Sequence, residues 1–512
     1  MEGDILMKKK LCLLLASLAM GTMFLGCGKV KTDEEQKNYD GRAFYEIFVR
    51  SYNDSDGDGI GDLKGVTQKL DYLQDLGVKG IWLMPINESP SYHGYDVIDY
   101  YKIQSDYGDF DDLQELLEEA HKRDIKVIMD LVINHTSSSN EWFKSARESK
   151  DSEYRDYYIW TDDMSKKNSV SPMQTMEWSK NGTKDELYYS IFWSEMPDLN
   201  MDNPKVVEEV KKIAKFYLDK GIDGFRMDAA KWIFNEKEKN VEFWKDFNDY
   251  VKSVNKDAIL VGEVWDSPYN NVEYTTSLDS FFEFSIGDYI KDEIFRHGIA
   301  DFPDDYNSVK ELYDEENPDF VMASFLRNHD QDRIFSALGD DLFKMKTAAC
   351  MYLTLPGTPY IYYGEEIGMI GGGKDENKRQ PFIWDTDTSK NTSWEVSTND
   401  ENAIAVSVEE KDKDSLLNFY KDILRVRNNY SVLRYGKVEK SETSDENLMG
   451  MKRVYQNEEA YVIINASDKS GTVKVSEGSY QVVYSNKGKE EDIKADSEIT
   501  VDSEEILIVI KK

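Results

Sequence analysis

Three acidic residues stand where a chain could use them for chemistry. Asp228 closes the segment Gly-Phe-Arg-Met-Asp, Glu263 lies in Val-Gly-Glu-Val-Trp, and Asp330 follows Phe-Leu-Arg-Asn-His. Each of them lies where an apolar run, which predicts a buried strand, meets a polar turn. Two carboxyl groups held close together, one protonated and one ionised, are the usual equipment for cleaving a glycosidic bond. The first hypothesis is therefore an enzyme that acts on sugars.

Eight short apolar segments, separated by helical patterns, are predicted to be the strands that position these acids. A parallel barrel gathers the C-terminal ends of its strands on one face, where polar residues are typically catalytic. The alternation of strands and helices predicts the α/β class and a (β/α)8 TIM barrel. The predicted strands are residues 44–49, 80–84, 126–133, 224–227, 259–262, 280–284, 321–325 and 360–363.

The length of the chain predicts more than one domain, because 512 residues are too many for one ordinary domain. After the third strand, residues 135–200 are rich in Ser, Tyr, Trp, Asn and Asp and lack a long periodic helix, which predicts an inserted domain. Residues 431–512 contain short alternating apolar runs, which predict a C-terminal antiparallel β-sandwich domain. The catalytic barrel would then comprise residues 39–134 and 201–430.

The N-terminal sequence predicts export. Three lysines precede an apolar run that ends at Gly26-Cys27-Gly28, so residues 1–27 are typical of a signal peptide and 28–38 of a polar tether. Phe24-Leu25-Gly26-Cys27 resembles a bacterial lipobox, in which the cysteine is lipidated. We expect an extracellular bacterial protein, either a cell-surface lipoprotein attached to the membrane through Cys27 or a protein secreted after ordinary cleavage.

The formal net charge of −36 restricts the partners. Nucleic acids and anionic membrane surfaces would be repelled by such a surface, whereas a neutral polysaccharide would not. We therefore expect no nucleic-acid partner.

An acidic, glycine-containing loop at residues 54–62 predicts a calcium site. The loop reads Asp-Ser-Asp-Gly-Asp-Gly-Ile-Gly-Asp, and hard oxygen ligands at this density suit Ca²⁺. It begins like an EF-hand loop, but its twelfth position is Gly65 and the predicted element before it is a strand. A metal-free, solvated acidic turn is the alternative. The candidate ligands are Asp54, Asp56, Asp58, the carbonyl of Ile60, and Asp62.

Five segments together carry a resemblance to a known family. They are Asp-Leu-Val-Ile-Asn-His (130–135), Met-Pro-Asp-Leu-Asn (196–200), Gly-Phe-Arg-Met-Asp-Ala-Ala-Lys (224–231), Gly-Glu-Val-Trp (262–265) and Phe-Leu-Arg-Asn-His-Asp (325–330). The chain resembles the α-amylase family, glycoside hydrolase family 13, whose members retain the anomeric configuration of the sugar.

The resemblance implies roles for individual residues. Asp228 would be the nucleophile, Glu263 the general acid/base, and Asp330 a third carboxylate that grips the sugar and helps to distort its ring. The residues implied in substrate binding are His93, Tyr95, His135, Arg226, Lys231, Trp232 and His329. In many relatives, residues at the places of Asn134 and Asp198 bind a calcium ion, and a second calcium site is left open there.

Details of the motifs favour an α-amylase that cuts inside α-1,4-glucans such as starch, glycogen and maltooligosaccharides. Lys231 and Trp232 follow the implied nucleophile as they do in α-amylases, and no acidic residue stands around Tyr92 to close the cleft. We expect a monomer. The alternatives within the family are an α-glucosidase, a cyclomaltodextrinase or neopullulanase, and a glucanotransferase. A non-catalytic glycan-binding lipoprotein is a remote alternative, because all three carboxylates are present.

Overall fold

The computed structural model describes residues 39–512, except residues 172 and 401–403. The predicted signal peptide, the tether and Cys27 lie outside the described residues. Within the described part of the chain, no helix combines the length and the apolar composition that crossing a membrane requires.

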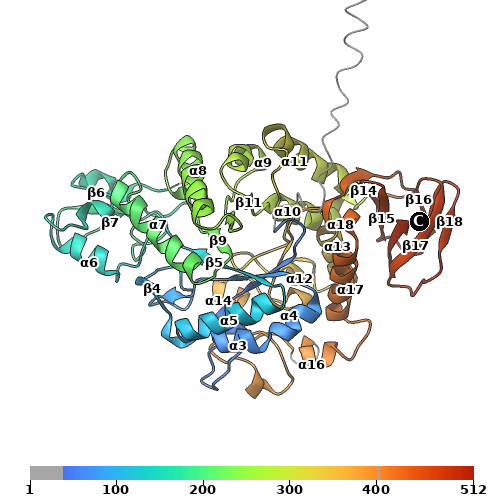
Figure 1. Ribbon diagram of the computed structural model, residues 1–512, viewed down its shortest axis with the longest axis horizontal. Coiled ribbons are helices and arrows are strands. Elements are labelled where there is room, and N and C mark those ends of the chain that lie inside the picture. The colour runs from blue at the N-terminus through green and yellow to red at the C-terminus, as the bar shows by residue number, and fades with distance from the viewer. Residues whose placement is uncertain (1–38, 172, 401–403) are drawn as a thin grey trace, which may run out of the picture. The chain divides into compact units, whose positions relative to one another are not determined.

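A parallel sheet forms the centre of the molecule (Figure 1). Its strands lie in the order β11-β10-β9-β5-β2-β1-β12, and every neighbouring pair is parallel. The strands are β1 (Phe44–Ile47), β2 (Gly80–Leu83), β5 (Lys126–Leu131), β9 (Gly224–Met227), β10 (Ile259–Gly262), β11 (Ser280–Phe281) and β12 (Tyr360–Tyr362). Each coincides with a predicted strand.

The seventh predicted strand closes the barrel as isolated bridges rather than as a regular strand. Parallel bridges join Phe282 to Ala323 and Phe325 to Tyr360. The amide of Tyr360 donates to the carbonyl of Ser324 at 2.8 Å, so this segment links β11 to β12. The predicted (β/α)8 barrel is therefore confirmed, although its seventh strand is irregular.

Alternation along the strands separates the inside of the barrel from the helical layer, because successive side chains on a strand face opposite ways. The inward positions nearest the N-terminal ends are apolar and form one buried cluster, whereas those nearest the C-terminal ends carry Glu46, Asp130 and Arg226. Asp130 and Arg226 are direct neighbours in the β5–β9 register. The apolar cluster contains Tyr39, Phe44, Trp82, Ile128, Ile259, Val261, Phe282, Phe284, Val321, Ala323, Phe325 and Tyr360.

Amphipathic helices cover the outside of the barrel. Asp109 begins α5 with a capping box, and the apolar positions Leu113, Leu116, Leu117 and Ala120 are buried. The longer helices are α5 (Phe110–Lys122), α7 (Pro204–Asp219), α8 (Lys237–Val254), α10 (Phe284–Asp292), α11 (Phe302–Glu316), α13 (Leu342–Leu353) and α17 (Leu416–Asn429). The shorter ones are α2 (Val49–Tyr52), α3 (Leu63–Gln68), α4 (Leu70–Leu76), α6 (Glu141–Glu148), α9 (Pro268–Asn271), α12 (Ile334–Ala337), α14 (Asp375–Lys378), α16 (Val406–Glu409) and α18 (Ser431–Tyr435).

Two additions to the barrel lie near the C-terminal ends of its strands. The hairpin of β3 (Asn87–Glu88) and β4 (Asp99–Ile103) follows β2. The segment predicted as an inserted domain contains α6 and a small sheet of β6 (Trp160–Thr161), β8 (Leu187–Tyr189) and β7 (Trp178–Lys180).

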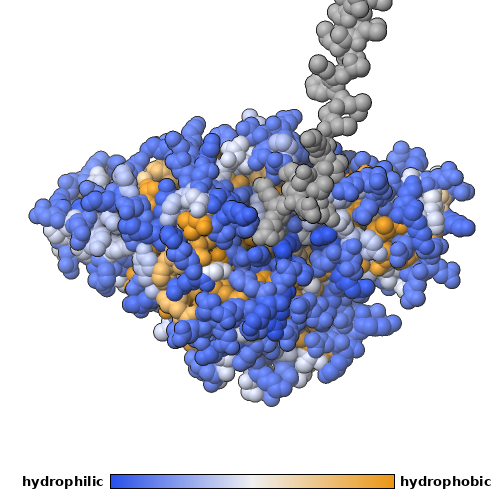
Figure 2. Space-filling view, in the orientation of Figure 1, coloured by the Kyte–Doolittle hydropathy of each residue, from blue (hydrophilic) through white to orange (hydrophobic). Residues whose placement is uncertain are grey.

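The C-terminal segment folds into antiparallel sheets around a core of its own. One sheet has the order β13-β14-β15-β20-β17-β18, and β16 pairs with β19. The strands are β13 (Lys437–Lys440), β14 (Leu448–Tyr455), β15 (Glu458–Asn465), β16 (Gly471–Lys474), β17 (Gly478–Ser485), β18 (Ile493–Ala495), β19 (Glu498–Val501) and β20 (Glu505–Lys511). Figure 2 shows a predominantly hydrophilic face, in keeping with the acidic composition.

Candidate active site

The turn after β9 brings the first two predicted acids together. Asp228 follows this strand, and Ala229 then adopts a left-handed backbone with φ 48° and ψ 39°. This conformation is strained for a residue with a side chain, and such strain concentrates at functional sites. It aims the Ala229 amide at Glu263, whose Oε2 accepts its hydrogen bond at 2.9 Å.

Arg226 joins three carboxylates beneath the cavity floor. Its Nη1 bonds to Asp228 Oδ1 at 2.5 Å and also to Asp130, and its Nη2 lies 3.0 Å from Glu263 Oε2. The Arg226 side chain is fully buried. Asp228 and Glu263 therefore share one guanidinium, which holds them on the same side of the barrel mouth.

His329 and Arg379 fix the third acid. Asp330 lies 3.1 Å from Nε2 of His329 and 2.9 Å from Nη2 of Arg379. Nδ1 of His329 contacts Glu46 of β1 at 2.5 Å. Although burial opposes both shifts, the pKa of His329 is raised to about 10 by Asp330 and Glu46, and the pKa of Asp330 is held well below its ordinary value. Asp330 is thus ionised at neutral pH.

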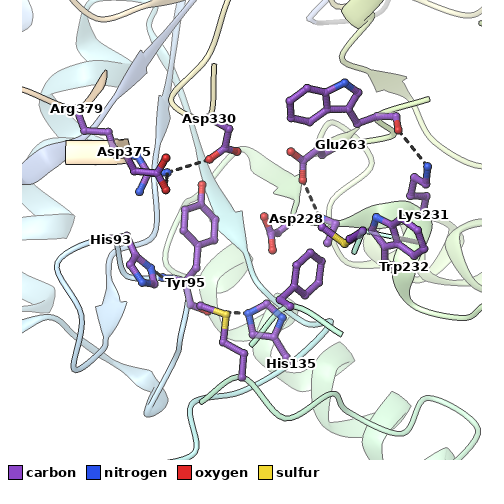
Figure 3. A pocket seen from close by; sticks show the side chains of 15 residues that line it. His93, Tyr95, His135, Asp228, Lys231, Trp232, Glu263, Asp330, Asp375 and Arg379 are labelled. Carbon is purple, nitrogen blue, oxygen red and sulfur yellow. Dashed lines mark hydrogen bonds and ion pairs between the residues drawn. The ribbon is translucent and has the colours of Figure 1, made fainter. Parts of the chain in front are cut away.

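The three predicted acids line one cavity of about 370 Å³. Figure 3 shows His93, Tyr95, Asp375 and Arg379 on one side of Asp228, and Lys231 and Trp232 on the other. The complete lining is His93, Tyr95, His135, Met173, Phe192, Met196, Asp228, Ala229, Lys231, Trp232, Glu263, Trp265, Asp330, Asp375 and Arg379.

The loop between β3 and β4 carries His93 and Tyr95 to this cavity. Gly94 between them has a φ of +81°, and an added Cβ would lie 3.0 Å from Pro85, so glycine is needed there. The Tyr95 ring stacks on His329, and its hydroxyl lies 2.7 Å from His329 Nε2. Nε2 of His135 contacts the Tyr95 carbonyl at 3.1 Å. A ring face and several polar groups thus converge on the space above Asp228.

Lys231, Trp232 and Trp265 form the opposite side. Nζ of Lys231 bonds to Asp266 Oδ2 at 2.8 Å and to the Trp265 carbonyl at 3.1 Å. The Trp265 ring stacks on Phe284 with centroids 4.4 Å apart and yet remains 47% exposed. This side therefore offers an open aromatic surface together with a cation.

Each predicted substrate-binding residue is accounted for in this geometry. His93, Tyr95, His135, Lys231 and Trp232 line the cavity. Arg226 and His329 do not line it and lie buried beneath it, where they bind the acids.

The 54–62 loop brings three of its five candidate calcium ligands together. One carboxylate oxygen from each of Asp54, Asp56 and Asp58 lies within 4.8 Å of the others. Asp62 instead caps α3, because its Oδ1 accepts from Gly65 N at 2.7 Å and its Oδ2 accepts from Ser55 N at 2.8 Å. Ile60 is half-buried beside this group.

Asn134 and Asp198 lie close together, since the amide of Leu199 donates to the Asn134 carbonyl at 2.9 Å. His135 and Asp198 are joined by an antiparallel bridge. The Asn134 amide donates to the Trp232 carbonyl at 2.7 Å, and Asp198 Oδ1 accepts from Ile191 N at 2.9 Å. Burial raises the pKa of Asp198 to about 8.

Sequence reasoning missed four functional-site residues. Asp130 is the first residue of one of the five segments. It is the direct neighbour of Arg226 in the β5–β9 register, so a comparison of the two strands points to the site. Glu46 is the single acidic residue in the otherwise apolar strand β1, and this contrast is the signal in the sequence that points to it. Arg379 and Asp375 belong to a loop after β12, where nothing local in the sequence points to the site. Asp375 lines the cavity on the side of Tyr95 (Figure 3).

Comparison with known proteins decides the family. The model of the α-amylase catalytic domain matches residues 46–436. The chain belongs to the α-amylase family. It is therefore a glycoside hydrolase of family 13, as the five segments implied.

Relatives of this family member have several activities. The chain is 46% identical to α-amylase 3 of Dictyoglomus thermophilum over 89% of both chains. It is 32% identical to an oligo-1,6-glucosidase of Parageobacillus thermoglucosidasius, covering 86% of this chain and 92% of the relative. A crystal structure of an α-amylase from H. orenii superposes with a TM-score of 0.86 at 41% identity, covering 92% of this chain and 99% of that one.

Proposed function

We propose that this protein is an α-amylase that hydrolyses internal α-1,4 bonds of starch and related α-glucans with retention of configuration. The observation that supports the proposal is that the carboxyl groups of Asp228 and Glu263 both bind the guanidinium of Arg226. A retaining glycosidase needs its nucleophile and its acid close together, so that the nucleophile reaches the anomeric carbon directly.

The residues divide the reaction between them. Asp228 attacks the anomeric carbon as Glu263 protonates the departing oxygen, and Glu263 then takes a proton from the water that releases the sugar. Arg226 holds the Asp228 carboxylate in position through their buried ion pair. Burial raises the pKa of Glu263 above its ordinary value, Arg226 opposes this, and Asp228 and Asp330 add to it. Glu263 is thereby suited to donate a proton near neutral pH.

Digestion of soluble starch tests the proposal. We expect the iodine colour to collapse long before reducing ends approach completion, because the Lys231–Trp265 side is open to further rings. Maltose and short maltooligosaccharides should appear in the α configuration, which proton NMR detects in the first minutes. Glucose alone, with polymer length barely falling, would instead establish an α-glucosidase, an activity that the oligo-1,6-glucosidase relative makes the second candidate.

The alkaline side of the pH profile should report Glu263. Because the protonated carboxyl is the active form and its pKa is raised, kcat/KM should fall as pH rises through that raised pKa. A maltooligosaccharide carrying an activated nitrophenol leaving group needs no proton. We therefore expect Glu263→Ala to lose the alkaline decline on this substrate while keeping measurable activity. An alkaline decline of the same position in the variant would show that another group causes it.

We also propose that the 54–62 loop binds Ca²⁺ through Asp54, Asp56 and Asp58. Hard carboxylate oxygens at this spacing suit the ion. Asp54 is already oriented, because its Oδ1 accepts from Gly57 N and its Oδ2 from Gly59 N, both at 2.7 Å. Within the described residues, no lysine or arginine forms an ion pair with the three acids. Bound calcium would neutralise the mutual repulsion of the three carboxylates and hold the loop in place.

A chelator should lower the melting temperature if calcium binds there. An ion that binds only the folded protein, at a hundred times its Kd, stabilises it by about 2.7 kcal/mol. Asp56→Ala with Asp58→Ala should remove most of the response to the chelator. Asp257→Ala with Asp496→Ala removes the same charge from two exposed positions and should leave the response intact. Identical melting curves of the wild type with and without chelator would contradict the proposal.

Three further proposals rest on sequence alone. The N-terminal pattern supports export, followed by lipidation at Cys27 or by plain secretion. The acidic surface supports a protein that binds neutral glucans rather than nucleic acid. We propose that the protein acts as a monomer.

A further inference from the structure

The indole of Trp394 lies outside the cavity and contacts two parts of the chain that build the cavity wall. Its ring stacks on the ring of Tyr92, with centroids 5.3 Å apart and an interplanar angle of 23°. Its Nε1 donates to Oγ of Ser51 at 2.8 Å. Trp394, Tyr92 and Ser51 do not line the cavity themselves. One residue outside the cavity is therefore joined to its wall in two places.

The contact with Tyr92 leads to the loop between β3 and β4. Tyr92 is directly followed by His93, whose ring packs edge-on against it with centroids 5.4 Å apart. Phe48 packs edge-on against both Trp394 and Tyr92, with centroids at 5.7 and 6.4 Å. These rings hold the start of the loop that carries His93 and Tyr95 to the cavity.

The contact with Ser51 leads to Arg379, on the loop after β12. Ser51 is fully buried, and its Oγ, which accepts from Trp394, donates in turn to the Arg379 carbonyl at 2.5 Å. The Ser51 carbonyl accepts from the amide of Phe382 at 2.8 Å, which fixes the same loop again. Arg379 lines the cavity and binds Asp330 through its side chain. Loss of the indole would leave the Ser51 hydroxyl without one of its two bonds.

The backbone beside Trp394 is fixed independently of the cavity. The amide of Ser393 donates to the carbonyl of Gly59, in the acidic 54–62 loop, at 2.8 Å. The Trp394 side chain is half-buried and packs against the main core. A ring that is held by its own backbone and by packing can fix the groups that it touches, because its own position is determined.

We propose that Trp394 is a positioning residue for the part of the cavity wall that binds the glucan. The proposal rests on the proposed function. The ring holds the start of the loop between β3 and β4, and Nε1 holds the serine beside the loop after β12. Figure 3 shows that the cavity residues of these two loops lie on the same side of the site, namely His93, Tyr95 and Arg379. A displaced indole would therefore move several sugar contacts together.

Two substitutions of Trp394 test the proposal. Leucine keeps an apolar side chain but removes both contacts, whereas phenylalanine keeps a ring that can stack on Tyr92. We expect Trp394→Leu to lower kcat/KM on maltohexaose about tenfold, mainly through a higher KM, because misplaced binding groups weaken the hold on the sugar. Trp394→Phe should keep kcat/KM within about threefold of the wild type. In a Glu263→Gln background, which is expected to be inactive, calorimetry should show a higher Kd for maltohexaose with Trp394→Leu.

Trp160→Leu is the matched control. Trp160 is also half-buried, its ring stacks on Phe143 with centroids 5.7 Å apart, and its Nε1 donates to the Arg155 carbonyl at 2.8 Å. None of these three residues lines the cavity. Both leucine variants should lower the melting temperature, whereas only Trp394→Leu should lower kcat/KM. Equal losses of kcat/KM in the two variants would overturn the proposal, because a general loss of packing would then explain them.

The outcomes separate this inference from the proposed function. If the wild type does not hydrolyse maltohexaose, the proposed function fails, and the inference that rests on it fails too. If the wild type hydrolyses maltohexaose and Trp394→Leu keeps its KM and kcat, only the role of Trp394 is overturned. A loss in Trp394→Phe as large as that in Trp394→Leu would also overturn it, since stacking on Tyr92 would then not position the wall.

Discussion

Asp228→Asn and Glu263→Gln are each expected to abolish starch hydrolysis. The first removes the nucleophile and the second the proton donor, and no other group of the cavity supplies either step. Each replacement is nearly isosteric, so both proteins should fold. We expect kcat on starch to fall by at least about a thousandfold. Reducing-end assays with purified protein measure this directly.

A melting curve distinguishes lost chemistry from lost structure. Both variants should melt close to the wild type, because Arg226 keeps two of its three carboxylate partners in each. A variant that folds and keeps more than about a tenth of the wild-type kcat would show that its role is wrongly assigned.

Arg226→Met is expected to have the second largest effect, and it should act on stability as well as on activity. The substitution leaves Asp130, Asp228 and Glu263 without the cation that they share in a buried site. Removing one partner of a buried ion pair costs about 3–5 kcal/mol, because the remaining charge is uncompensated. We expect the free energy of unfolding to fall by about that amount and starch hydrolysis to fall below detection. Urea unfolding measures the first.

Arg123→Met is the matched control. Arg123 also binds two carboxylates, Asp71 at 2.8 Å and Glu119 at 2.8 Å, but it does so at the surface. Exposed ion pairs contribute about 0–1 kcal/mol, since water screens them. If the two variants lost similar stability, the buried network around Arg226 would not have the importance given to it here.

The sequence predicted the barrel well because its strands are buried runs bounded by turns, a local signal. The three acids that line the cavity could be found for a related reason, since each of them ends such a run. The irregular seventh strand could not be foreseen, because its pairing depends on bridges to distant segments. The structure separates helices α3 and α4 at Lys69, whose φ of −103° and ψ of 6° are not helical.

The cavity wall was less predictable than its floor. Asp375 and Arg379 follow β12 in the sequence, while the residues near them in the cavity wall come from the loop between β3 and β4 and from the segment before β12. No repeating pattern in the sequence connects Asp375 and Arg379 with those residues. The sequence also did not reveal that Asp62 caps a helix. An aspartate before a helix can serve as a metal ligand or as a cap, and in the structure the backbone amides of Gly65 and Ser55 donate to it.

The contact between Glu46 and His329 has a consequence for how the enzyme becomes active. The two residues are separated by 283 positions, and β1 pairs with β12 to complete the ring. Contacts between such remote positions form late, because closing a long loop costs entropy before the contact compensates it. The site therefore does not exist in a partly made or partly folded chain. An enzyme built in this way has no activity until the last barrel strand is in place, and a shortened product would be inert rather than weakly active.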